Sequence, residues 1–225
     1  YAKDLELRYN SNGVEWRDDL FELWSNFKLV RFHYSIDSIK EMNSYIRYPS
    51  EWDNQVKTFH RLDNETTDNV EVTIACAVQA LNVYYLPDLI QWKLEQGFHK
   101  INMWPFGAGG ISQHFVYWPA HLNVKVLPEW FKKECRRKYE AWYPWWEANW
   151  ELGIPSWRKG KVEYEQWRSA EYGIKRLNGI LSFMESEDWS RRLPEMKEFL
   201  SLCDQQRGVS FAETFPEMKD IFNEL

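Results

Sequence analysis

In the first half of the chain, short apolar segments with a period of two alternate with longer segments whose apolar positions follow the period of a helix. Residues 27–34 and 70–78 are rich in β-branched and aromatic side chains, and residues 5–9 alternate apolar and polar positions. Residues 18–24 and a segment that begins at Ser50 instead place apolar side chains on one helical face. We therefore predict three strands and two helices here, with Ser50 as the N-cap of the second helix.

The alternation continues for about half of the chain. A helix is predicted from Leu86, with Pro87 in its first turn and Gly97 at its end, and a strand at residues 99–104 leads into a glycine-rich turn. Strands and helices that alternate at roughly 30-residue intervals are typical of parallel βαβ units. Residues 1–118 are thus predicted to form βα units of a parallel α/β fold.

Helical patterns replace the alternation after that point. One more strand is predicted at residues 122–127, and the segments after it have the apolar spacing of helices, at residues 128–151, 163–186, 192–206 and 216–225. A helix with an apolar stripe must bury that stripe against a partner. Residues 119–225 are therefore predicted to form a mainly helical region that packs on the α/β part or on itself.

The overall composition predicts a soluble globular protein. The chain has 225 residues, of which 44% are hydrophobic and 28% charged. Its net charge of −6 argues against a general polyanion binder, so no nucleic-acid partner is expected. Apolar runs stay well below the roughly 20 residues that a membrane-spanning helix needs, and no secretory leader pattern is present, so no membrane partner is expected.

The cysteines carry little chemistry in this sequence. Cys76, Cys135 and Cys203 are widely separated, which is neither a disulfide framework nor the spacing of a metal site. Free cysteine is among the most buried residue types, so each is interpreted as a core thiol. The pattern predicts a reducing, cytoplasmic location, no metal ligands and no auxiliary iron–sulfur cluster.

Tryptophan is unusually frequent, with 14 residues, and several of them lie within residues 142–150. Tryptophan buries a large area and keeps one hydrogen-bond donor for a polar partner. This favours a core or docking face over a surface on which sugars or bases stack, although the second interpretation stays open.

Ser35 and Asp37 follow the predicted strand at residues 27–34 and are candidate ligand-binding residues. A carboxylate at the end of a parallel strand is well placed to accept both hydroxyls of a ribose. Asp37 could equally be the N-cap of a helix that starts near Ile39. The residues alone leave both roles open.

Two further features have plainer interpretations. The glycine-rich residues 107–110 could hold an anion with backbone amides, but they lack the Gly-Lys-Ser/Thr of a phosphate loop, so a flexible loop is favoured. His33 lies within a predicted strand, and the five histidines have no ligand spacing, so His33 is interpreted as a core or barrel-lining residue.

Several motifs in order resemble one known family. They are Asn12-Gly13 after the first strand, Ser35-Ile36-Asp37, Tyr45-Ile46-Arg47-Tyr48-Pro49, Val78-Gln79-Ala80-Leu81-Asn82-Val83, the strand-like segment at residues 123–128 and the C-terminal residues 202–208, Phe211 and Phe215-Pro216-Glu217. Together they are similar to the middle and the tail of radical S-adenosylmethionine (SAM) proteins that contain a twitch domain. The resemblance covers almost the whole chain.

This resemblance implies a partial radical SAM (βα) barrel followed by a twitch-like, mainly helical extension. It also implies a set of SAM-binding residues. Ser35 and Asp37 would bind the ribose or the amino-acid end, and Arg47 would pair with the SAM carboxylate, a role that suits its fork of donors. The remaining positions would orient or border the ligand: Asn12, Asn82 and the backbone of Phe106 and Gly107.

The chain departs from the family in one major respect. The CxxxCxxC loop that holds the four-iron four-sulfur cluster is missing, so the chain is expected to be a fragment that is inactive alone. The resemblance implies that the parent protein uses SAM, that cluster and an electron donor such as flavodoxin or ferredoxin. It would cleave SAM reductively to a 5′-deoxyadenosyl radical and abstract a hydrogen atom from an unknown substrate.

Two alternative functions remain open at this point. One is a degenerate radical SAM barrel that serves as a non-catalytic binding or scaffold protein. The other is an α/β-barrel protein that acts on glycans and uses carboxylates at strand ends with a tryptophan-lined cleft.

Overall fold

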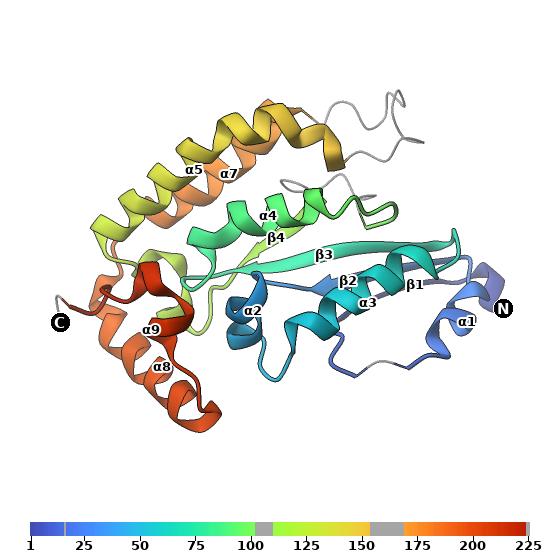
Figure 1. The fold of residues 1–225 in the computed structure, drawn as a ribbon, viewed down its shortest axis with the longest axis horizontal. Coiled ribbons are helices and arrows are strands. Elements are labelled where there is room, and N and C mark those ends of the chain that lie inside the picture. Colours follow the sequence, from blue (N-terminus) through green and yellow to red (C-terminus); the bar gives the residue numbers. More distant parts are fainter. Residues whose placement is uncertain (16, 102–109, 154–168, 224–225) are drawn as a thin grey trace.

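Four parallel strands form the centre of the structure, a computed structural model that describes residues 1–15, 17–101, 110–153 and 169–223. The strands pair in the order in which they occur in the sequence (Figure 1): β1 (Glu6–Ser11), β2 (Leu29–Ser35), β3 (Val70–Val78) and β4 (Ile111–Phe115). The α-helices are α1 (Leu20–Ser25), α2 (Lys40–Ile46), α3 (Trp52–Asn64), α4 (Leu86–Glu95), α5 (Glu129–Asn149), α7 (Ala170–Glu185), α8 (Leu193–Arg207) and α9 (Phe211–Thr214).

Side-chain alternation along β2 decides which face of the sheet is buried. Val30, Phe32 and Tyr34 are buried, while the residues between them are only half-buried. The parallel register places Phe32 between Tyr9 of β1 and Val72 of β3, so the apolar positions of neighbouring strands share one face. This common apolar face forms the core of the α/β part.

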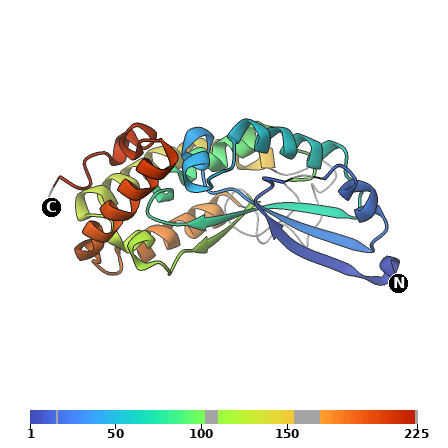
Figure 2. The ribbon, with the colours of Figure 1, turned by 90° about the horizontal axis from the view of Figure 1, so that it is seen from below.

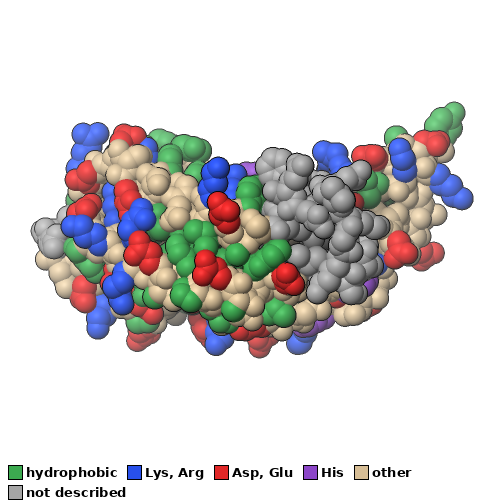
Figure 3. Space-filling view, turned by 90° about the horizontal axis from the view of Figure 1, so that it is seen from above, with side chains coloured by type: hydrophobic (Ala, Val, Ile, Leu, Met, Phe, Trp, Pro, Cys, Tyr) green, Lys and Arg blue, Asp and Glu red, His purple; other side chains and the backbone are tan. Residues whose placement is uncertain are grey.

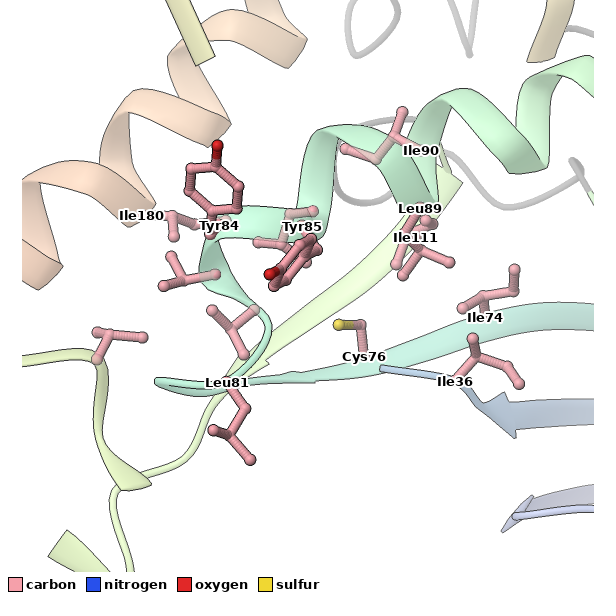
Figure 4. Close-up of a cluster of buried hydrophobic side chains, with 14 of the residues drawn as sticks. Ile36, Ile74, Cys76, Leu81, Tyr84, Tyr85, Leu89, Ile90, Ile111 and Ile180 are labelled. Carbon is pink, nitrogen blue, oxygen red and sulfur yellow. The ribbon is translucent and has the colours of Figure 1, made fainter. Parts of the chain in front are cut away.

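Helices cover that apolar face (Figure 2), where α2, α3 and α4 lie on the same side of the sheet. Phe59 of α3 meets Tyr34 edge to face, with ring centroids 4.6 Å apart. Leu89 of α4 points from the helix toward the strands (Figure 4), and Leu89 and Ile74 of β3 are both fully buried. Burial of large apolar side chains against the sheet is the main contribution to the stability of this layer.

The opposite face of the sheet is polar. Arg31 forms an ion pair with Glu71, Nε to Oε2 at 2.9 Å, and His33 and Ser35 are half-buried beside them. A parallel sheet in an α/β protein normally has two apolar faces because helices cover both. A polar second face is what the lining of a ligand-binding barrel requires, although barrel closure itself stays a prediction.

The long helix α5 connects the α/β part to the helices that follow. Tyr139 is fully buried and donates to the carbonyl of Val83 at 2.6 Å, and Trp142 donates to Gln91 of α4 at 3.0 Å. On its other side α5 runs along α7 (Figure 1), where Tyr143 donates to Asn178 at 3.0 Å. The polar ends of the aromatic side chains thus fix how α5 lies on its neighbours.

Three tryptophans of residues 142–150 take part in this packing. Trp142 stacks on both Trp145 and Trp146, and Trp146 is buried and donates to the carbonyl of Ala170 at 2.9 Å. Their contacts agree with the core interpretation of this segment. Trp157 and Trp167 lie outside the described residues.

Helices α8 and α9 attach to the α/β part through α2. Asp204 of α8 accepts from the Tyr45 hydroxyl at 2.7 Å and from the Phe211 amide at 2.9 Å. Arg207 donates to the Tyr45 carbonyl at 3.0 Å, and Gly208 then ends α8 in the left-handed conformation. Burial raises the pKa of Tyr45, and the hydrogen bond to Asp204 raises it further, so the hydroxyl remains the donor. Buried side chains of both predicted regions form one core cluster, and the division at residue 118 stays a prediction.

Most predicted elements of the first half are present, and the α/β class is confirmed. Strands occur at residues 6–11, 29–35 and 70–78, and helices α1, α3, α4, α5 and α8 occur near their predicted positions. Helix α7 begins at Ala170, and the start of its predicted range lies outside the described residues. The structure also contains α2 and β4, which the sequence patterns did not predict.

The remaining predictions were wrong for local reasons. Glu51, not Ser50, precedes the first turn of α3, and the Trp52 amide donates to Ser44. Asn123 accepts from the Lys125 amide and caps a 3₁₀ turn where a strand at 122–127 was predicted. Residues 216–218 form a 3₁₀ turn and the described residues after them form turns, in place of the predicted C-terminal helix.

The strand predicted at residues 99–104 is not formed in its described part. The Asp63 carboxylate accepts from the backbone amides of His99, Lys100 and Ile101 at 2.7–3.2 Å, and these three residues form bends and a turn. Residues 102–104 lie outside the described residues. Among the described residues no helix is long and apolar enough to cross a membrane.

The contact of α7 with α5 predicts opposite effects for two glycines of one helix. A Cβ atom at Gly173 would lie 2.3 Å from the Trp146 ring, whereas a Cβ atom at Gly179 would meet nothing within 4 Å. We expect Gly173→Ala to lower the free energy of unfolding by about 1–3 kcal/mol through overpacking. Gly179→Ala should raise it by up to about 1 kcal/mol, because alanine is the better helix former. Urea denaturation of both variants measures this, and equal effects would contradict the packing.

Candidate functional site

Asp37 lies just beyond the carboxyl end of β2 and is the centre of a buried polar cluster. Its side chain is 4% exposed. Oδ1 accepts from the Ala77 amide of β3 at 2.7 Å, and Oδ2 lies 2.8 Å from Arg47 Nε. The second contact is an ion pair whose N–H is not well aligned for a hydrogen bond. Asp37 therefore links the ends of two strands to the C-terminal end of α2.

The backbone after β2 is held by Asn43 of α2. Its Oδ1 accepts from the amides of Asp37 at 2.9 Å and Ser38 at 3.1 Å. Its Nδ2 donates to Gln55 of α3 at 2.5 Å, and Gln55 donates in turn to the Asn12 carbonyl at 3.1 Å. Through this chain of amides the turn after β1 is connected to the end of β2.

Asn82 performs the same function after β3. Its Nδ2 donates to the carbonyls of Asp37 and Ala77, both at 2.9 Å, and its Oδ1 accepts from the Gln79 amide at 2.8 Å. Asn82 is completely buried. We call the side chains of Asp37, Arg47, Asn43, Gln55 and Asn82 the strand-end network, because they join the carboxyl ends of β1, β2 and β3.

Three of the sequence-predicted site residues therefore come together, namely Asp37, Arg47 and Asn82. Ser35 is half-buried on the polar face of the sheet, and its hydroxyl has no hydrogen-bond partner among the described residues. Asn12 is exposed and joins the network only through its carbonyl, while its side chain accepts from the Val14 amide at 3.3 Å. Phe106 and Gly107 lie outside the described residues.

Sequence reasoning missed Asn43 and Gln55. Both occupy helical positions that otherwise bear apolar core residues: Asn43 falls between Ile39 and Ile46, and Gln55 precedes Phe59 by one helical turn. A polar residue on an apolar stripe must find partners inside the protein. This was the available signal for a buried network.

Burial controls the electrostatics of the network. It raises the pKa of the Asp37 carboxyl above its ordinary value, while Arg47 and the Ala77 amide act in the opposite direction. Burial and the neighbouring Asp37 also raise the pKa of the Cys76 thiol well above its usual value. Cys76 lies among apolar side chains (Figure 4) and is therefore a protonated core thiol rather than a nucleophile.

A second group of polar residues lies on the polar face of the sheet. His33 pairs in register with Thr73, whose hydroxyl is buried without a partner among the described residues. On β4, Ser112 Oγ lies 2.8 Å from His114 Nε2. Burial lowers the pKa of His33, and nearby His114 and Arg8 lower it further. This face therefore offers hydrogen-bond donors and acceptors together with the Arg31–Glu71 ion pair.

The described residues do not fit an iron–sulfur cluster. They contain no group of three or more side chains that could hold a metal ion. The thiols of Cys76, Cys135 and Cys203 are buried on three different elements, and burial raises the pKa of Cys76 and Cys135. Since thiolates and not thiols bind iron, these cysteines cannot provide a cluster site, and we derive no chemistry through one.

On the face shown in Figure 3, acidic and basic side chains are interspersed, and hydrophobic side chains gather in its middle.

No protein-family model, no curated protein and no solved structure matches this chain.

The strand-end network predicts a large cost for the loss of Asn82. Asn82→Ala removes three hydrogen bonds that a completely buried side chain makes with buried or partly buried backbone groups. We expect the free energy of unfolding to fall by at least about 2 kcal/mol. Asn64→Ala, at an exposed position of α3, should change it by less than about 0.5 kcal/mol. Chemical denaturation provides both values, and a similar small change in the two variants would contradict a structural role for the network.

The lowered pKa of His33 predicts a pH-dependent contribution to stability. A histidine whose pKa is depressed by folding stabilises the protein above its ordinary pKa, and this stabilisation is lost as the pH falls toward the folded pKa. We expect His33→Gln to become more stable relative to the unchanged chain as the pH falls from about 7.5 to about 5. Urea unfolding measures the trend, and an equal trend in His60→Gln, at an exposed position, would contradict its assignment to the burial of His33.

Proposed function

We propose that this chain is part of a radical SAM protein and supplies residues that bind SAM. The observation that carries the proposal is the Asp37–Arg47 pair at the carboxyl end of β2, tied through Asn82 to the end of β3. Ligands of parallel α/β sheets bind at the carboxyl ends of the strands. The parallel sheet, its polar face and this position of the network support the assignment that the motifs suggested.

Arg47 is the residue that we assign to the SAM carboxylate. Its side chain is 22% exposed, and Nε lies 2.8 Å from Asp37 Oδ2. A guanidinium can use its two terminal nitrogens as a fork for a carboxylate. Asp37 then acts first as a positioning residue, because one of its oxygens already contacts Ala77 and the other Arg47.

The remaining predicted residues take supporting roles in this proposal. Ser35 offers a free hydroxyl on the polar face, and Asn82 fixes the backbone at Asp37. The radical chemistry that the resemblance implies would have to be supplied by groups that the described residues do not hold. The part proposed for the described residues is limited to binding and orienting SAM.

A non-catalytic binding protein of the same family would use the same SAM site, and the geometry suits it equally. The glycan-active alternative has no comparable support. Trp142 stacks on both Trp145 and Trp146, and all three pack in or against the core. The indole nitrogens of Trp142 and Trp146 also donate hydrogen bonds within the fold. We therefore retain the SAM-binding function.

The test is SAM binding by the longest protein that the gene encodes, measured by isothermal titration calorimetry. If Arg47 holds the SAM carboxylate, Arg47→Ala should weaken SAM binding by more than the roughly 1–3 kcal/mol of a lost charged hydrogen bond. Decarboxylated SAM lacks the group that Arg47 would contact, so its affinity should change far less. Arg47→Lys keeps a positive charge beside Asp37 but lacks the two terminal guanidinium nitrogens. It therefore distinguishes weaker SAM binding through the lost contact from weaker binding through unfolding.

Arg61→Ala is the matched control, because Arg61 pairs with Asp18 and Glu65 on the outer side of α3. It should bind SAM as the unchanged protein does. The proposal fails if the protein does not bind SAM, or if Arg47→Ala affects SAM and its decarboxylated analogue equally while the variant remains folded.

A further inference from the structure

Residues 204–217, which we call the C-terminal corner, contact the chain just after β2 and again just after β3. Figure 1 shows α8 and α9 beside α2. Two tyrosine hydroxyls donate to carboxylates of the corner, and these hydrogen bonds join residues that are 159 and 132 positions apart in the sequence. The corner therefore reaches both segments from which the strand-end network is built.

The first contact lies at the end of α2. Tyr45 donates to Asp204 at 2.7 Å, and Arg207 donates to the Tyr45 carbonyl at 3.0 Å. Carbonyls in the last turn of a helix have no partner within the helix, and a cation is favourable there. Arg47 follows two residues later as the C-cap of α2. Because the backbone leaves the helix at Arg47, the position of the last turn decides how its side chain reaches Asp37.

The second contact lies in the turn after β3. Tyr85 donates to Glu217 at 2.5 Å, and the Tyr85 amide donates to the Asn82 carbonyl at 2.9 Å. Burial raises the pKa of Tyr85, and the hydrogen bond to Glu217 raises it further, so the hydroxyl remains the donor. The corner thus holds the backbone beside Asn82, whose side chain donates to the Asp37 carbonyl.

Phe215 connects the two contacts. Its side chain is fully buried, and its ring centroid lies 5.3 Å from that of Tyr45, edge to face, and 5.9 Å from that of Tyr85. Both tyrosines are themselves buried. Since side chains in a protein core are closely packed, a shift of one tyrosine is transmitted through Phe215 to the other.

We propose that the C-terminal corner positions the strand-end network, and that it holds Arg47 and Asn82 in the arrangement that binds SAM. Groups that bind a ligand must be held within about 0.5 Å of the productive geometry by the residues behind them. Asp204 and Glu217 act through the tyrosines and are therefore positioning residues. The statement about SAM rests on the function proposed above, whereas the coupling between the corner and the network does not.

Hydrogen exchange of the 225-residue chain without ligand tests the coupling. Tyr45→Phe removes the hydroxyl that donates to Asp204 and keeps the ring. The amides of Asp37 and Ser38 are held by the network. We expect them to exchange about threefold faster or more, measured relative to the Phe32 amide in the middle of β2, because loss of the hydrogen bond lets the network open locally.

Tyr143→Phe is the matched control. It removes a tyrosine hydrogen bond of the same kind, to Asn178 between α5 and α7, and should leave the relative exchange rates of the network amides unchanged. The reference amide removes any general loss of stability from the comparison. Equal changes in the two variants, or no change in either, would overturn the proposal.

Titration calorimetry with SAM and with decarboxylated SAM then measures the effect on binding. Tyr45→Phe should lower the ratio of the two affinities about threefold or more, because the carboxylate that Arg47 would contact is present in SAM alone. Partial unfolding weakens both ligands equally and leaves this ratio unchanged. An unchanged ratio would therefore overturn the positioning of Arg47. Failure to bind either ligand would refute the proposed function, while hydrogen exchange would still decide whether the corner holds the network.

Discussion

The burial of the Asp37 carboxyl is the constraint on which much of this structure depends. A carboxyl group removed from water must be matched by donors at its own position, and here the Ala77 amide and Arg47 provide them. This requirement fixes the path of the chain from β2 to the end of α2. Because α2 also carries Tyr45, to which α8 and α9 attach, the position of the C-terminal helices follows from the same buried group.

Sequence patterns predicted the elements that depend on short-range order. The apolar pattern in residues 29–35 and 70–78 is strong enough to define two strands. Asp37, Arg47 and Asn82, which the resemblance to radical SAM proteins had indicated, lie together in the structure, and their role in binding stays a prediction. The failures had two kinds of cause: a short-range cap, as at Asn123, and a contact over a long distance in the sequence, as at Asp63. The Asp63 carboxylate accepts hydrogen bonds from three backbone amides of a segment with strand-like composition, and no local sequence pattern indicates this contact.

The network itself was only half predictable for a related physical reason. Asn43 and Gln55 occupy positions on apolar helical faces, where a single polar residue does not change the helix that the apolar pattern predicts. Their burial is tolerated because both side chains are hydrogen-bonded: Asn43 accepts from the Asp37 amide and donates to Gln55, and Gln55 donates to the Asn12 carbonyl. The same residues explain why the ends of three strands form one unit rather than three independent turns, which is the rigidity a binding site at this edge needs.

The strand order has a consequence for how the chain assembles. Each described strand of the sheet pairs with the described strand that precedes it in the sequence, so β2, β3 and β4 each find a partner that has already been synthesised. The sheet can therefore grow in the direction of synthesis, one βα unit at a time, with a short search at every step. The order in which the polypeptide emerges and the order of strands in space are the same, and no completed strand has to wait for the far end of the chain.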